Sequence, residues 1–99
     1  MNEQTEQIIS DILKHKGKEF AVIGAIVECN ELTAELMKDI YRKKDNRDDI
    51  FGEVADVYIM LEFLKKIYNF SDAEIWDYLN KKMPNKWSER IEGWKSEKD

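Results

Sequence analysis

The sequence has few of the residues that interrupt helices or cross-link chains. Its 99 residues include one proline and four glycines, too few for a sheet protein with many tight turns. The single cysteine excludes a disulfide framework and a cysteine-based zinc site, and it favours a reducing setting. No apolar run approaches the ~20 residues of a membrane span, and the polar start is not that of a signal peptide. We therefore expect a cytoplasmic, all-α protein with no membrane partner.

Charged residues are abundant, at 37% of the chain, and acids outnumber bases by 21 to 16. The resulting net charge of −5 argues against binding to a nucleic acid polymer. Nine acids and three bases lie within residues 45–79, whereas residues 80–99 hold six bases and four acids. Solvated helix surfaces with random local imbalance produce such a pattern. A protein that combines a cation site with a polyanion site produces it as well.

Apolar residues recur at intervals of three and four, which predicts four helices in a single domain spanning residues 1–99. The first two helices are expected at about 3–16 and 19–44, with Gly17 as the stop between them. The second helix ends in basic residues, which complement the negative end of the helix dipole. The short polar segment that follows predicts a turn, so the next helix returns antiparallel.

The third helix is expected from an N-cap at Asn46 to about Tyr68, and it is apolar nearly all round. Such a helix is either the central one or faces a second subunit. The fourth is expected to begin with a capping box, Ser71–Glu74, and to end at Pro84. Beyond it we expect a short docked helix and a frayed tail at about 95–99.

Two pairs of acids have a spacing that places both members on one helix face. The pairs are Glu28 with Glu31 and Glu53 with Asp56, each three residues apart. The 21 residues between Glu31 and Glu53 are enough to finish one helix and return antiparallel. Four converging carboxylates repel one another unless a divalent cation neutralises them, and hard oxygen ligands suit Mg²⁺ or Mn²⁺. The sequence therefore predicts a metal site between the second and third helices.

This pattern resembles the signature of the MazG-like all-α nucleoside triphosphate pyrophosphohydrolases, in which E-x-x-E is followed by E-x-x-D. Residues 53–68, EVADVYIMLEFLKKIY, are similar to the metal-binding helix of that family. Asn80 and Lys82, followed by Lys86, are similar to the segment that such enzymes present to the triphosphate. The resemblance covers about residues 19–87, the expected core. It implies a four-helix bundle-like MazG-type fold that assembles into a homodimer or homotetramer.

The activity that this resemblance implies is hydrolysis of a nucleoside triphosphate, NTP or dNTP, to the monophosphate and pyrophosphate, for nucleotide-pool housekeeping. The implied cofactor is Mg²⁺, with Mn²⁺ as a substitute, and its ligands are Glu28, Glu31, Glu53 and Asp56. The implied base that takes the proton of the attacking water is one of Glu28, Glu31 and Glu35. The implied phosphate-binding residues are Asn80, Lys82 and Lys86.

Other interpretations remain open at this point. The chain could be a non-catalytic helical interaction protein that uses its apolar third helix, or a related enzyme that acts on a phosphoribosyl nucleotide. Glu35 could simply pair with Lys38, and the lysines near the C-terminus could be ordinary surface residues. A ferritin-like di-iron site is excluded because the chain has only one histidine. The chain has no glycine-rich phosphate loop, which excludes a P-loop enzyme.

Overall fold

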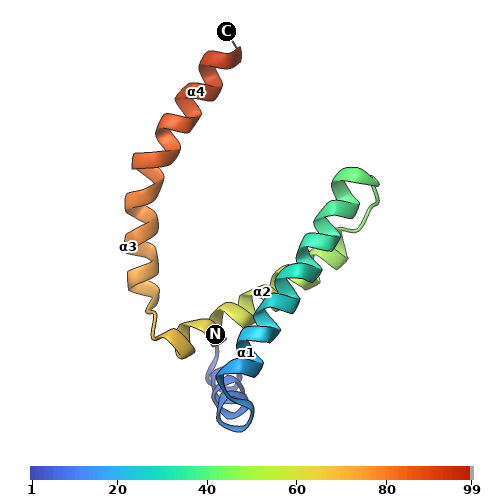
Figure 1. The fold of residues 1–99 in the computed structure, drawn as a ribbon, viewed down its shortest axis with the longest axis vertical. Helices are drawn as coiled ribbons and strands as arrows, with labels where there is room; N and C mark the ends of the chain where they lie inside the picture. Colours follow the sequence, from blue (N-terminus) through green and yellow to red (C-terminus); the bar gives the residue numbers. More distant parts are fainter. Residues whose placement is uncertain (99) are drawn as a thin grey trace. The chain divides into compact units, whose positions relative to one another are not determined.

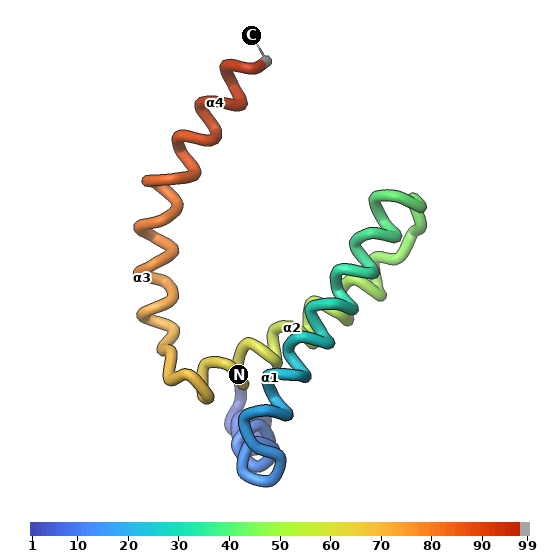
Figure 2. Tube along the Cα trace, viewed as in Figure 1, coloured from blue at the N-terminus to red at the C-terminus, as the bar shows by residue number. Residues whose placement is uncertain are grey.

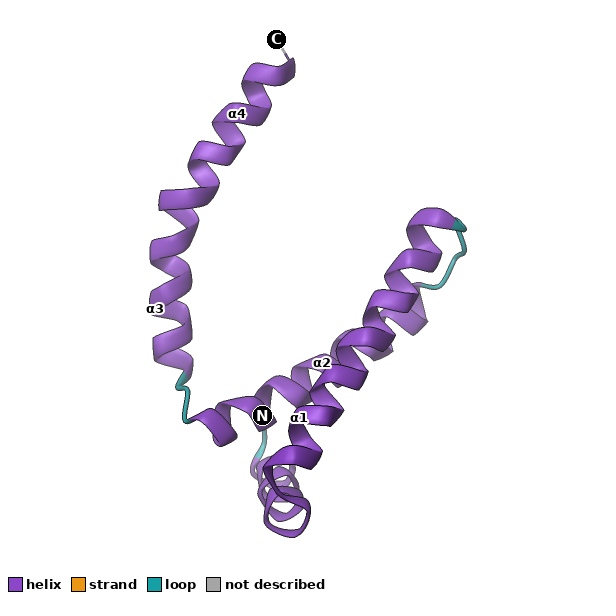
Figure 3. Cartoon of the chain, in the orientation of Figure 1, coloured by secondary structure: helices purple, strands orange, loops and turns teal. Residues whose placement is uncertain are grey.

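The computed structural model describes residues 1–98, and their regular structure is entirely helical (Figure 3). The all-α prediction is therefore confirmed. The chain divides into two units, Met1–Asn69 and the residues from Phe70 onward, and each is treated separately below. The elements in chain order are α1 (Glu3–Tyr41), α2 (Arg47–Tyr68), α3 (Asp72–Lys82), a π-helical segment (Met83–Trp87) and α4 (Ser88–Lys98). Among the described residues, no helix is both long and apolar enough to cross a bilayer.

The first unit is a helical hairpin in which α2 returns antiparallel to α1 (Figure 1). Gly17 interrupts α1 with φ 83° and ψ −179°, a conformation that glycine adopts without steric cost. The Cα trace of α1 changes direction within its blue, N-terminal part (Figure 2). The break expected at Gly17 is confirmed, although the second helical segment ends at Tyr41 and not at Lys44.

The kink at Gly17 allows both parts of α1 to contact the same region of α2. The core cluster joins Ile9 from the first part of α1, Ala21 from the second part and Phe63 from α2. Four partly buried side chains surround it: Ile12, Leu13, Met60 and Ile67. The core cluster thus includes Ile9, which precedes residue 19, the start of the segment that resembles the MazG-like family.

Much of the apolar surface of the hairpin stays exposed. Phe63 is the buried residue of α2, although this helix is the most apolar of the chain. Large apolar side chains that are at least half exposed occur on both helices of the hairpin: Ile8, Phe20, Ile23, Ile26, Met37, Ile40, Tyr41, Phe51 and Tyr58. A single copy of the first unit therefore does not cover the apolar surface that its own sequence carries.

The second unit begins with the capping box that the sequence predicts. The Ser71 hydroxyl accepts a hydrogen bond from the Glu74 amide at 3.1 Å, and the Glu74 carboxylate accepts one from the Ser71 amide at 2.9 Å. This prediction is confirmed. The reciprocal bonds satisfy two of the free N–H groups that every helix start exposes.

The α-helix α3 ends at Lys82, close to the end expected at Pro84, but Met83 keeps helical φ and ψ and the chain continues through the π-helical segment into α4. Proline lacks an N–H, and its ring collides with the carbonyl four residues back in a regular α-helix. Here Pro84 lies in the first turn of the π-helical segment Met83–Trp87, and the chain passes the proline without leaving helical geometry. The tail expected to be frayed is helical as far as Lys98, and Asp99 lies outside the described residues.

Candidate metal centre

Three of the four predicted metal ligands meet between the two helices of the hairpin. Glu28 on α1 and Glu53 and Asp56 on α2 each place a carboxylate oxygen within 4.8 Å of those of the other two. The periodicity of each helix puts these acids on the facing sides, and the antiparallel return of α2 brings them to the same level. Glu31 is exposed and adds its negative charge to the cluster.

Two oxygens of this cluster lack the hydrogen bonds that buried polar atoms normally make. Oε2 of Glu28 and Oε2 of Glu53 are buried from solvent and have no hydrogen-bond partner among the described residues. Burying a charged oxygen without a partner is unfavourable, because the lost hydration is not replaced. The arrangement is therefore stabilised by anything that supplies positive charge or a proton at this position.

The electrostatics of the cluster favour protonation when no cation is bound. Burial raises the pKa of Glu28 and of Glu53 above the ordinary value of 4.5, and the nearby charges of Glu31 and Asp56 raise both pKa values further. A divalent cation removes the same repulsion by neutralising the carboxylates.

The donor set fits Mg²⁺ or Mn²⁺. All the converging atoms are carboxylate oxygens, the hard ligands that both ions prefer. Oxygens on opposite sides of one Mg²⁺ ion are about 4 Å apart. The spacing in the hairpin thus suits a single ion with little movement of the side chains. The two unpartnered oxygens are the feature of this cluster that is most compatible with a bound cation.

Glu35, the third candidate base, lies in a different environment. Lys38 Nζ lies 2.9 Å from its Oε1, and Asn46 Nδ2 donates a hydrogen bond of 2.7 Å to its Oε2. These donors hold the pKa of Glu35 below its ordinary value. The ion pair between Glu35 and Lys38 that the sequence suggested is present. A carboxylate with a donor on each oxygen is a poor proton acceptor, and the role of Glu35 as a base stays a prediction from the sequence.

The predicted phosphate-binding residues belong to the second unit. Asn80 and Lys82 lie on α3, and Lys86 lies in the π-helical segment. Asn80 and Lys86 are exposed, whereas Lys82 is half-buried, with its Nζ 5.8 Å from the centroid of the Tyr78 ring. Their role therefore stays a prediction from the sequence.

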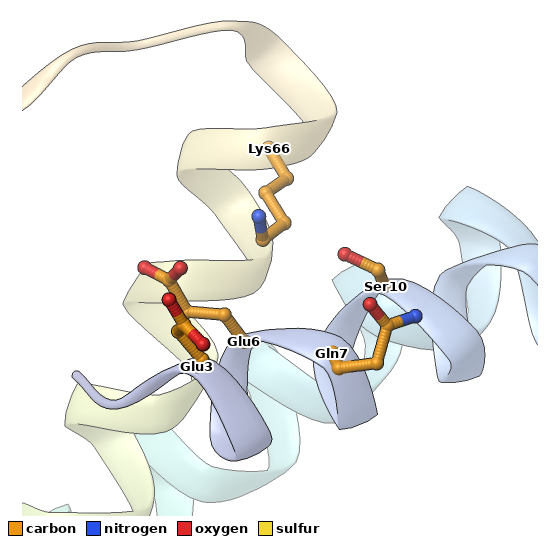
Figure 4. A pocket seen from close by; sticks show the side chains of 5 residues that line it. All are labelled: Glu3, Glu6, Gln7, Ser10 and Lys66. Atoms are coloured by element: carbon orange, nitrogen blue, oxygen red, sulfur yellow. The ribbon is translucent and has the colours of Figure 1, made fainter.

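A second group of polar residues lies near the start of α1. A shallow hollow is lined by Glu3, Glu6, Gln7 and Ser10 together with Lys66, whose side chain extends into it from α2 (Figure 4). The lysine offsets part of the negative charge of the two acids, and the side chains are exposed. This hollow therefore lacks the unpartnered buried oxygens that distinguish the acid cluster.

Asn46 is the residue of this region that the sequence did not reveal as important. We expected it to cap α2, but its side chain makes no capping hydrogen bond. It is 4% exposed and contacts Glu35 of α1. Its partner lies eleven residues earlier in the chain, so no local sequence pattern predicts the contact.

Comparisons of the chain with protein-family models, with curated proteins and with solved structures find no match. The functional conclusion accordingly depends on the chemistry of the acid cluster and on the motif that its residues form.

Proposed function

We propose that this protein is a Mg²⁺-dependent nucleoside triphosphate pyrophosphohydrolase with a MazG-type four-helix fold. The observation that supports the proposal most directly is the convergence of Glu28, Glu53 and Asp56, with two buried and unpartnered oxygens. A cluster of this kind is unfavourable in a protein that binds no cation. The E-x-x-E and E-x-x-D spacing adds the reaction class, because it resembles the metal-binding signature of those enzymes.

In this proposal Glu28, Glu53 and Asp56 hold the ion, and Glu31 completes the ligand set. The bound ion offsets negative charge on the phosphate oxygens and lowers the pKa of water. The resemblance alone implies phosphate binding by Asn80, Lys82 and Lys86, which belong to the second unit. Water adds to the α-phosphorus, and pyrophosphate leaves. The proton of the water passes to Glu28 or Glu31, since Glu35 already has a donor on each oxygen.

Substrate screening is the experiment that tests this proposal. Canonical and modified NTPs and dNTPs are incubated with the protein and with Mg²⁺ or Mn²⁺, and the products are separated and identified. We expect at least one nucleotide to be converted to its monophosphate and pyrophosphate, and we expect EDTA to abolish the reaction. Release of orthophosphate without pyrophosphate contradicts the proposal, as does the absence of turnover across the panel.

We also propose that the protein is a homodimer or homotetramer. The exposed apolar residues of the hairpin, such as Phe51 at 67% and Ile40 at 64%, support this assembly. Apolar surface of this extent normally marks an interface in a soluble protein. Sedimentation velocity at micromolar concentration is expected to give twice or four times the mass of 11.8 kDa. A monomer at that concentration contradicts the proposal.

The second candidate function is that of a non-catalytic helical interaction protein. The same exposed apolar side chains favour it, since they suit a protein partner as well as a second copy. It predicts no nucleotide turnover and no effect of divalent cations on the melting temperature. The substrate screen and the melting experiment described below therefore separate the two functions.

A further inference from the structure

Asn46 connects the start of α2 to α1. Its Nδ2 donates to the backbone carbonyl of Glu35 at 2.9 Å and to the carboxylate Oε2 of the same residue at 2.7 Å. Its own carbonyl accepts from the amide of Ile50 at 3.0 Å, the first hydrogen bond of α2. Asn46 therefore links the start of α2 to the position of Glu35 on α1.

The orientation of the Asn46 amide follows from its partners. Both partner atoms are oxygens that only accept hydrogen bonds, so the amide nitrogen must face them. Its Oδ1 points elsewhere and is buried without a partner among the described residues. An aspartate at this position would place a carboxylate against the Glu35 carboxylate, and the contact would become repulsive.

The contact between Glu35 and Asn46 is separated by the same number of residues from Glu28 on α1 and from Glu53 on α2. Glu28 precedes Glu35 by seven residues on α1, and Glu53 follows Asn46 by seven residues. Seven residues are about two helical turns, or ~10.5 Å along the axis. In an antiparallel hairpin, a contact between Glu35 and Asn46 therefore sets Glu28 and Glu53 at the same level and on the same side as that contact.

We propose that Asn46 is a positioning residue that sets the register of α2 against α1 and thereby places Glu28 opposite Glu53. The inference deepens the proposed function, because the register decides whether the acids converge on one cation. Glu35 then acts through Asn46 as the other half of this contact. Slippage by one helical turn, 5.4 Å, would move Glu53 out of reach of Glu28.

Metal affinity is the first test. Mn²⁺ binding is measured by electron paramagnetic resonance of the free ion, at a temperature where circular dichroism shows every variant to be folded. Asn46→Asp is expected to weaken Mn²⁺ binding ~10-fold, the loss typical of residues that orient metal ligands. Glu35→Gln keeps the backbone carbonyl and one side-chain oxygen as acceptors for Asn46, loses the ion pair with Lys38, and is expected to stay within about threefold of the wild type. A tenfold loss in Glu35→Gln would instead indicate a direct role for its charge and overturn the inference.

Two further variants separate positioning from general stability. Glu35→Gln combined with Asn46→Asp allows the new amide to donate to the new carboxylate, and it is expected to recover at least threefold of the lost affinity. Asn2→Ala is the matched control, because Asn2 Oδ1 accepts from the Thr5 amide at 2.8 Å and caps α1. It is expected to lower the melting temperature with Mn²⁺ affinity unchanged. If Asn2→Ala weakens Mn²⁺ binding as much as Asn46→Asp, the effect is one of stability and the inference fails.

A distance measurement tests the register without any metal. Nitroxide labels on the exposed native Cys29 of α1 and on Lys66→Cys of α2 report the axial alignment of the helices by double electron–electron resonance. Excess unlabelled protein suppresses distances between subunits. We expect one narrow distribution in the parent protein, and a shift of about 5 Å or a clear broadening in Asn46→Asp. An unchanged distribution overturns the inference. Failure of the parent protein to bind Mn²⁺ overturns the proposed function instead.

Discussion

Glu53→Gln is expected to reduce Mg²⁺-dependent nucleotide hydrolysis by at least ~100-fold while raising the melting temperature of the metal-free protein. Loss of a ligand removes part of the several kcal/mol that a catalytic cation supplies, and each ~1.4 kcal/mol is a factor of ten in rate. Stability changes in the opposite direction, because the amide removes a charge that Glu31 and Asp56 repel. Initial rates of pyrophosphate release and thermal melts in EDTA measure the two effects.

Glu62→Gln is the matched control for this experiment. Glu62 lies on the same helix, is half-buried, and forms an ion pair with Lys65 outside the acid cluster. We expect it to leave hydrolysis within about twofold of the wild type and to cause no increase in melting temperature, since it removes a favourable contact. Retention of more than a tenth of the activity by Glu53→Gln would contradict the proposed role of Glu53. A lower melting temperature for Glu53→Gln in EDTA would contradict the repulsion that we infer within the cluster.

Saturating Mg²⁺ at pH 7 is expected to raise the melting temperature by ~10–20 °C. A ligand at 100 times its Kd stabilises the folded state by about 2.7 kcal/mol. For a domain of this size, each kcal/mol corresponds to roughly 4–8 °C. Thermal melts with MgCl₂ and with EDTA at matched ionic strength measure the difference. An equal increase with KCl would show general screening and not site binding.

The stabilisation by Mg²⁺ is also expected to depend on pH in a defined direction. Glu28 and Glu53 have raised pKa values in the folded state, so the folded protein binds protons more tightly than the unfolded chain does. The contribution of these two glutamates to the stability of the folded state is favourable below the ordinary pKa of 4.5. It is lost as the pH rises through their raised pKa values in the folded state. The Mg²⁺-induced increase in melting temperature should grow over the same interval, because protons compete with the ion for the carboxylates.

The contribution of Glu35 to folding stability has the opposite dependence on pH. Hydrogen bonds from Lys38 and Asn46 lower its pKa, so its contribution is present above 4.5 and is lost as pH falls through the lowered value. Glu53→Gln should reduce the growth of the Mg²⁺ effect with pH, whereas Glu35→Gln should leave most of it. An Mg²⁺ effect that stays constant from pH 4.5 to 8 would contradict the assignment of Glu28 and Glu53 as ligands.

Local sequence patterns predicted the features of this protein that depend on residues close together in the chain. The capping box at Ser71 and the break at Gly17 were predicted because each needs only a few adjacent residues. The convergence of Glu28 with Glu53 was also accessible, since helical periodicity places each pair on one face and a single turn reverses the chain. The α-helix ends at Lys82, close to Pro84 as predicted, but the π-helical segment that carries the chain past the proline was not predicted.

The sequence by itself thus determined the all-α class and the position of the acids on their helices, because these follow from composition and periodicity. Only the tertiary structure decided which oxygens are buried without partners, namely Oε2 of Glu28 and of Glu53. It alone paired Asn46 with Glu35, and so related the level of one helix to that of the other. Burial and register depend on how two helices contact each other along their length, and residues far apart in the chain set that contact.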